Sequence, residues 1–168
     1  MKTMTRSSRS PRPSATPLDA IDRRLLDLLQ KDNQVTNIAL ADKVGLSPPA
    51  CLKRVRRLRA EKIIVKDVAV LDPDSVGQSI VAFVGVELDR QREDVLAAFE
   101  RKIAAESAVQ QCYFVSGEID YLLTVLCRDM EAYNAFARRV LANEHNIKRF
   151  RTSFSLSRVK YETRIPLD

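Results

Sequence analysis

The chain has 168 residues, of which 45% are hydrophobic and 30% are charged, an ordinary composition for a globular protein. No apolar run is long enough to span a bilayer, and none follows the basic N-terminus, so neither a membrane span nor a secretory signal is expected. The three cysteines, Cys51, Cys112 and Cys127, form an odd set without metal-like spacing, which favours a reducing cytoplasm and predicts no metal or cofactor.

The charge is unevenly distributed along the chain. Residues 1–66 contain fifteen Lys/Arg and six Asp/Glu, whereas residues 67–168 contain thirteen and sixteen. A basic front half predicts that only this end meets a polyanion. Charge alone does not distinguish this interpretation from a basic surface without a partner.

The front of the chain begins with residues 1–17, rich in Ser, Pro and Arg, which predict a disordered basic tail. Apolar residues at helical spacing then indicate a first helix from Leu18 to about Asp32. A second helix is expected over residues 37–44, with Ile38, Ala41 and Val44 on one face. Gly45 favours a tight turn after it.

A third helix is expected from Pro48 to about Glu61, with Ser47 as its N-cap. Helix, glycine turn and helix within about twenty residues is the geometry that places a recognition helix in the DNA major groove. Residues 18–62 are therefore predicted to form a DNA-binding domain.

The third helix combines an apolar stripe with charged residues that are all positive. Cys51, Val55 and Leu58 are expected to face the core, which turns Lys53, Arg56 and Arg57 away from it and leaves Arg54 and Arg59 on the flanks. A helix with only positive charges is more typical of phosphate binding than of a solvated surface, because a solvated helix more often carries charges of both signs. The predicted contacts to double-stranded DNA are Asn37, Ser47, Lys53, Arg54, Arg56 and Arg57.

The back half predicts an α+β domain. Residues 63–79 are interpreted as a strand over 63–71 followed by a hinge. Residues 80–168 then give strands over 80–88, 109–116, 121–127 and 148–160, with helices over 93–105 and 130–143. This βαββαβ order is that of a ferredoxin-like sandwich.

Several of these strands are apolar on both faces. Along 80–88, Ile80, Ala82, Val84 and Val86 alternate with Val81 and Phe83. Two helices cover only one side of a four-stranded sheet, so the other side predicts a homodimer through a second copy of the sheet. The alternative is a monomer whose connecting strand covers this face.

The run QKDNQVTNIALADKVGLSPPACLKRVRRLRAEKIIVKDVAVLDPDSVG closely resembles the N-terminal domain of the Lrp/AsnC family of leucine- and asparagine-responsive regulators. VSGEIDYLL and FRTSFSLSRVKYETRIPL extend the resemblance to about residues 18–167. One departure is Lys62, where the family usually has glycine. A non-glycine residue there predicts either a longer helix or a strained turn.

The resemblance implies a transcription regulator whose assembly or DNA binding responds to a small effector, an amino acid, and whose dimers form higher homo-oligomers. By itself, the 115–121 loop reads as a hairpin with Gly117 at the turn. The resemblance implies that this loop binds the effector, with Asp120 pairing to the ammonium. The implied pocket contains Ser116, Gly117, Asp120, Tyr121, Thr152 and Ser153.

Two other function classes fit part of the sequence. Sirohaem decarboxylases share the two-domain organisation, but the single histidine, His145, gives no catalytic set, so no enzyme is expected. A protein that compacts DNA without regard to sequence shares every feature, and only binding selectivity separates it from a regulator.

Overall fold

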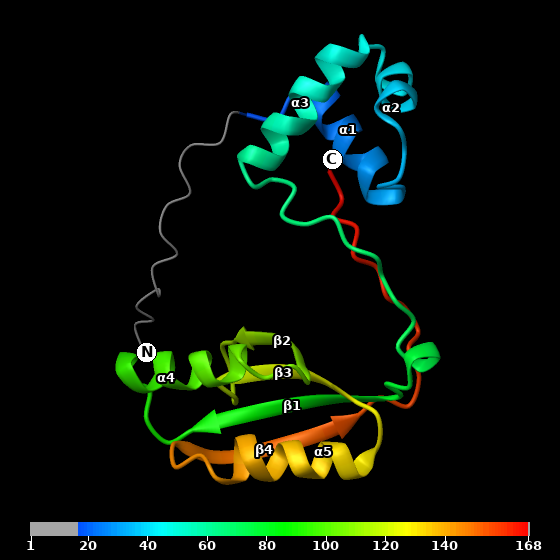
Figure 1. The fold of residues 1–168 in the computed structure, drawn as a ribbon. Helices are drawn as coiled ribbons and strands as arrows, with labels where there is room; N and C mark the ends of the chain where they lie inside the picture. Colours follow the sequence, from blue (N-terminus) through cyan, green and yellow to red (C-terminus); the bar gives the residue numbers. More distant parts are fainter. Residues whose placement is uncertain (1–16, 168) are drawn as a thin grey trace. The chain divides into compact units, whose positions relative to one another are not determined.

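The computed structural model describes residues 17–167 (Figure 1). The chain forms two compact units. The helical unit contains the described residues up to Ala69 and the segment that starts at Glu162, and the sheet unit is Val70–Tyr161. The predicted tail over residues 1–17 lies, apart from Pro17, outside the described residues.

The helical unit contains α1 (Ala20–Lys31), α2 (Asn37–Val44) and α3 (Pro48–Ala60). Thr36 caps α2 by accepting the Ala39 N–H, and Gly45 ends it with φ of 68°. Leucines, alanine, valines and Cys51 from the three helices form one apolar core: Leu25, Leu40, Ala41, Val44, Cys51 and Val55. Ile38 is not part of it, because its side chain is 72% exposed, so the predicted face of α2 is wrong at that position.

The connecting segment after α3 corrects another expectation. Residues 65–72 contain no strand, so the strand predicted over 63–71 is wrong. Val65, Val68 and Val70 are all exposed there. A β-branched run becomes a strand only when another backbone pairs with it, and this segment has no such neighbour within the described chain. The short helix η1 (Asp74–Val76) follows and ends at Gly77.

The sheet unit confirms the predicted βαββαβ order. It contains β1 (Ile80–Leu88), α4 (Glu93–Ala104), β2 (Val109–Phe114), β3 (Tyr121–Cys127), α5 (Met130–Phe136), which continues as η2 (Ala137–Ala142), and β4 (Ile147–Phe154). The strands form one antiparallel sheet in the order β2-β3-β1-β4. β4 ends six residues before the predicted Lys160.

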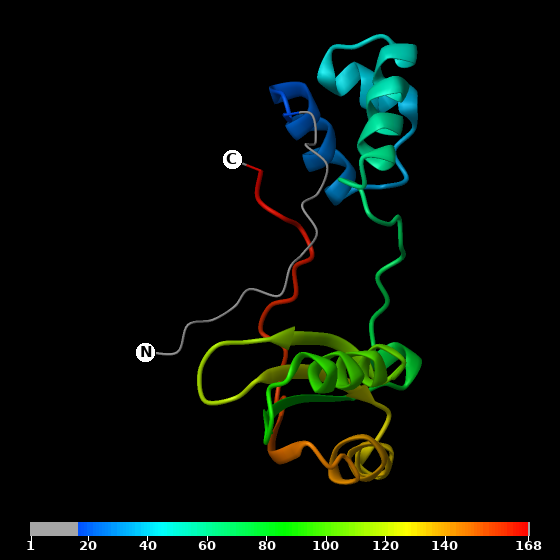
Figure 2. The ribbon, with the colours of Figure 1, turned by 90° about the vertical axis from the view of Figure 1, so that its left-hand side faces the viewer.

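The two faces of this sheet differ. Ala82, Val84 and Val86 of β1 are fully buried in a core with Phe99 of α4 and Phe136 of α5. Figure 2 shows these helices, α4 in green and α5 in orange, beside the sheet. The sheet face that these two helices cover contributes to the apolar core of the unit.

The opposite face is only partly covered by the described chain. Phe83 of β1 is 42% exposed and Tyr113 of β2 is 52% exposed. Strand alternation and the pairing register place these residues on one face with Leu122 of β3. We call this surface the open sheet face.

The end of the chain returns to the helical unit. The Ile165 N–H donates to Gln30 Oε1 at 2.7 Å, and Gln30 Nε2 donates to the Ile165 carbonyl at 3.1 Å. Arg164 also pairs with Asp27 of α1 at 2.6 Å. The final residues therefore belong with α1, whereas the sequence placed all of 80–168 in one domain. No helix in the described part of the chain could cross a membrane.

Candidate DNA-binding surface and effector loop

The turn between α2 and α3 is fixed by a side chain as well as by glycine. Asn37 Nδ2 donates to the Pro48 carbonyl at 2.8 Å, which joins the first residue of α2 to the first residue of α3. Asn37, predicted to contact DNA, thus also holds the two helices together. Ser47 is exposed at the N-cap of α3, and its side chain makes no capping hydrogen bond.

Helix α3 packs on the core as predicted, because Cys51, Val55 and Leu58 are all buried. It ends at Ala60, and Lys62 adopts a left-handed conformation with φ of 56°. The Ile63 N–H closes this turn by donating to the Leu58 carbonyl at 2.9 Å. The strained turn predicted from the missing glycine is therefore confirmed.

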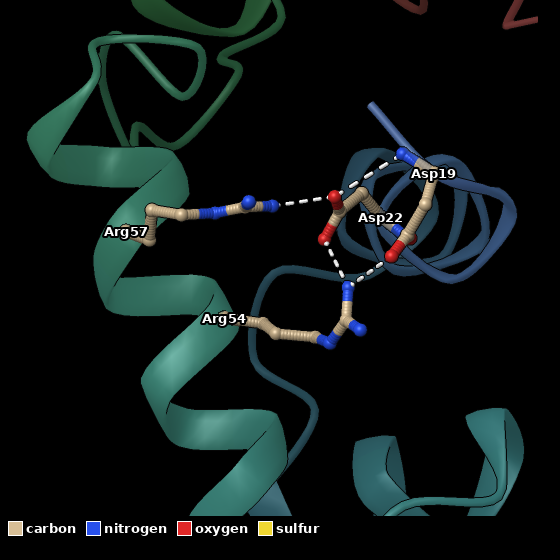
Figure 3. Close-up of polar contacts among 4 residues, drawn as sticks. All are labelled: Asp19, Asp22, Arg54 and Arg57. Carbon is tan, nitrogen blue, oxygen red and sulfur yellow. Dashed lines mark hydrogen bonds and ion pairs between the residues drawn. The ribbon is translucent and has the colours of Figure 1, made fainter. Parts of the chain in front are cut away.

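An ion-pair cluster links α3 to α1 (Figure 3). The carboxylate of Asp22 is 1% exposed and accepts hydrogen bonds from Arg57 Nη2 and, at 3.0 Å, from Arg54 Nη1. Arg54 also pairs with Asp19 at 2.6 Å. A buried carboxylate needs such partners, because an unpaired charge in the interior costs several kcal/mol.

The same cluster caps α1. Asp19 accepts the Asp22 N–H at 2.7 Å, and the Asp22 carboxylate accepts the Asp19 N–H at 3.3 Å. The hydrogen bond from the Asp22 N–H and the neighbouring Arg54 guanidinium lower the pKa of the Asp19 carboxyl below its usual range. Asp22 therefore serves both as part of a helix cap and as the anchor of two arginines.

The basic residues of α3 thus fall into three groups. Arg54 and Arg57 point toward α1, so the predicted orientation of Arg57, away from the core side, is wrong. Lys53 and Arg56 are exposed and form no ion pair within residues 17–167. Arg59 forms an exposed pair with Asp67 at 3.2 Å. Among the described residues, only Lys53 and Arg56 present unpaired charge along the solvent side of the helix.

Asp120 anchors the end of the 115–120 loop of the sheet unit through hydrogen bonds. Its carboxylate is buried and accepts the Leu88 N–H at 2.7 Å and the side-chain amide of Gln91. The Asp120 N–H donates to the Val86 carbonyl at 2.8 Å. One carboxylate oxygen has a fixed backbone donor, whereas the other has the side chain of Gln91, an exposed residue.

Other residues of the loop set its shape. Gly117 has φ of 136°, a conformation that L side chains rarely adopt, and it is exposed with Ser116 at the tip. Ile119 folds back over Gly85 of β1, where an added Cβ would lie 3.2 Å from the Ile119 side chain. The exposed tip and the buried Asp120 therefore belong to one compact loop.

The remaining residues of the predicted pocket do not lie together. The Tyr121 side chain is buried, donates to Glu100 at 2.8 Å and packs on Phe99, which places it in the core under α4. Thr152 hydrogen-bonds to the Tyr133 hydroxyl on the covered face. Ser153 pairs in register with Phe83 on the open sheet face. Thr152 and Ser153 therefore point to opposite sides of the sheet, and the structure does not bring them into one pocket.

Comparison with known families identifies the family of the chain. Residues 81–165 match the model of the Lrp/AsnC ligand binding domain, and residues 18–65 match a winged helix-turn-helix DNA-binding model. The chain belongs to the Lrp/AsnC family. It is therefore a transcription regulator with an N-terminal DNA-binding domain and a C-terminal ligand-binding domain, as the sequence predicted.

Individual transcription regulators resemble most of the chain. The leucine-responsive regulatory protein of Escherichia coli is 37% identical over 88% of this chain and 90% of its own length. An uncharacterised HTH-type regulator of Sinorhizobium fredii is 40% identical over 92% and 91%. The L-methionine complex of a Neisseria meningitidis regulator superposes with a TM-score of 0.85, at 33% identity over 90% and 98%.

Sequence reasoning missed two groups of residues in this Lrp/AsnC chain. Asp19 and Asp22 have the three-residue spacing of a capping box, so the cap was visible, but their pairing with arginines depends on how α1 packs on α3. Gln91 carried no signal, because it is 29 positions from Asp120.

Proposed function

We propose that α3 enters the major groove of double-stranded DNA with Lys53 and Arg56 toward the duplex and Ser47 at its leading end. The proposal rests on the exposure of these two cations on a helix-turn-helix recognition helix, where neither forms an ion pair with another residue of the described part of the chain. Arg54 and Arg57 act indirectly, by fixing α3 against α1. The chain works as a binding protein in the cytoplasm, where its DNA lies.

Electrophoretic mobility shifts on genomic fragments test this assignment. Lys53→Ala and Arg56→Ala should each weaken binding about tenfold, since each removes a contact to a phosphate or base worth about 1–3 kcal/mol. Arg138→Ala is the matched control, because Arg138 is an exposed arginine of the sheet unit. Unchanged affinity for both α3 variants would contradict the assignment. A visible haem absorption in the purified protein would instead support the enzyme class.

We further propose that an amino acid binds at the 115–120 loop with its ammonium on Asp120. Two structural relatives, from Neisseria meningitidis and Mycobacterium tuberculosis, were solved with L-methionine. In this chain the exposed loop tip offers backbone amides for a carboxylate, and the Asp120 oxygen that faces Gln91 can exchange that amide for an ammonium.

Isothermal calorimetry with L-methionine and L-leucine tests the effector site. Asp120→Asn keeps an oxygen acceptor for the Leu88 N–H and removes the negative charge, so it should fold normally and lose most of the binding. Asp120→Ala would also orphan that buried N–H and confuse binding with stability. Glu118→Gln, in the same loop, is the matched control. Loss of binding in Glu118→Gln but not in Asp120→Asn would move the ammonium partner to Glu118.

We also propose that two chains pair through the open sheet face and that such dimers assemble further. The exposed aromatic rings of Phe83 and Tyr113 support this, because a second copy of the face would remove them from water. Phe83→Glu should reduce the mass measured by light scattering to that of a monomer. Met130→Glu, at 43% exposure on the helix side, matches Phe83 at 42% and should leave the mass unchanged. Equal masses for both variants and the parent would contradict the pairing.

A further inference from the structure

The outward face of α3 has a composition that the basic residues alone do not reveal. Pro49, Leu52, Lys53 and Arg56 follow the i, i+3, i+4, i+7 spacing, which gathers them within about 100° of arc. This arc lies opposite the buried residues Cys51, Val55 and Leu58. We call these four positions the reading face.

Half of the reading face is apolar. Pro49 is exposed, and Leu52 is 36% exposed although it lies beside the buried Cys51. The two prolines that begin α3 have no N–H, which removes two of the donors that a helix N-terminus ordinarily offers to phosphate. The start of α3 is therefore rigid and apolar, a poor surface for the DNA backbone.

The other half of the reading face contains only donors. The Lys53 ammonium and the Arg56 guanidinium donate hydrogen bonds and accept none. No member of the reading face is Asn, Gln, Asp or Glu, the side chains that accept from the exocyclic amines of adenine and cytosine. Ser47, at the N-cap, can bond to any base and so adds no preference.

We propose that the reading face recognises thymine through its 5-methyl group and guanine through its acceptors. Pro49 and Leu52 contact thymine methyls, and Lys53 and Arg56 donate to guanine O6 and N7. The exocyclic amines of adenine and cytosine are not read directly. This inference rests on the proposed entry of α3 into the major groove and names what α3 selects there.

The test begins with selection from a random duplex DNA library by the full-length protein. The best-bound sequence is then resynthesised with single thymines replaced by uracil, which removes only the methyl group. At one or two positions per half-site, uracil should weaken binding about fourfold, the value of one buried methyl. Separately, 7-deazaguanine should weaken binding at the guanines that Lys53 or Arg56 contacts.

Leu52→Ala links the thymine effect to its side chain. This variant should lose about three- to tenfold affinity for the thymine duplex and show no further loss on uracil replacement at its position. Leu156→Ala removes a fully exposed leucine of the sheet unit and should retain the complete uracil effect. Circular dichroism melting of Leu52→Ala checks that the helical unit is intact. The uracil series is measured on the parent protein and needs no variant.

The outcomes separate this inference from the proposed function. If the protein binds DNA with the expected dependence on Lys53 and Arg56 but tolerates uracil everywhere, the reading of thymine is wrong and groove entry stands. If methylation of adenine N6 or cytosine N4 in the selected sites weakens binding, the protein reads these amines, and the proposed specificity of the reading face is also wrong. If Lys53→Ala and Arg56→Ala bind every duplex as the parent does, groove entry itself fails.

Discussion

The helical unit and the sheet unit are stabilised by different means. The sheet unit buries β-branched and aromatic side chains from two strands and two helices in a continuous apolar core. The helical unit has a smaller core, and it joins α1 to α3 through a carboxylate that is 1% exposed and two arginines. An ion pair is directional where apolar packing is not, so the smaller unit fixes the angle of its recognition helix with charge.

This contrast teaches where substitutions will be felt. In the helical unit, the residues that position α3 are charged and lie one helical turn or less from the residues proposed to face DNA. In the sheet unit, the proposed effector site lies on a loop and the proposed dimer interface on the open sheet face, while the core beneath is apolar. Hydrogen exchange with mass spectrometry can assign the effects of Asp22→Ala and Gly117→Ala to one unit.

Asp22→Ala should produce the largest effect, a loss of about 3 kcal/mol confined to the helical unit. It removes the carboxylate that accepts the Asp19 N–H in the capping box and leaves Arg54 and Arg57 without their buried partner. Asp27→Ala is the matched control on the same helix, because its pairs with Lys31 and Arg164 are more exposed, and it should cost much less than Asp22→Ala. Equal costs for the two variants would show that the cluster does not stabilise the unit.

Gly117→Ala should destabilise the sheet unit by about 1–2 kcal/mol and leave the helical unit unchanged. This loss of stability comes entirely from backbone strain at φ of 136°, because an added Cβ would meet no atom within 4 Å. Glu118→Ala, at the next position of the loop, should be nearly neutral. A neutral Gly117→Ala would mean that the loop relaxes freely and is not held by Asp120 at its end.

Lys62→Gly should stabilise the helical unit by about 1 kcal/mol. Lys62 adopts φ of 56°, and glycine reaches this region without the clash of a Cβ. Lys62→Ala is the control, since it removes the lysine charge and keeps the strained Cβ, and it should give no gain. Denaturant titration followed by circular dichroism measures both, and a gain in both would point to charge rather than backbone strain.

The smallest effect should be a dependence of the helical unit on acid. Hydrogen bonds to its carboxylate and the Arg54 guanidinium lower the pKa of Asp19, so its contribution is complete above the usual aspartate pKa of about 3.9 and is lost as pH falls below it. Asp19→Asn should flatten the fall in stability between about pH 5 and pH 2. Melting temperatures across that range test this, and parallel curves for parent and variant would contradict it.

The sequence predicted elements whose causes are local. The bounds of α2 agree with the prediction because Thr36 and Gly45 mark its two ends, and Pro48 marks the start of α3. The strand over 63–71 could not be decided locally, because its existence depends on a backbone to pair with. The final residues return to α1 through Gln30 and Ile165, which are 135 residues apart. No periodicity in the sequence predicts such a contact.

The candidate site was predictable to a similar degree. The turn at Gly117 and the exposure of Lys53 and Arg56 follow from residue type and helical spacing. Strand alternation already placed Thr152 and Ser153 on opposite faces, so that separation could have been foreseen. The orientation of Arg54 and Arg57 could not, because an arginine on the flank of a helix turns toward whichever carboxylate the neighbouring helix provides.

The chain passes between its two units twice, once after α3 and once after β4. Both passages meet the sheet at neighbouring points, because Ala82 pairs with Phe154 and the Ser155 N–H donates to the Val81 carbonyl at 2.9 Å. In topological terms the sheet unit is an insertion within the helical unit. A protease that cut only the connection after β4 would therefore leave the two units covalently joined, whereas a cut after α3 would leave α1, α2 and α3 held only by the contacts of Arg164 and Ile165 with α1.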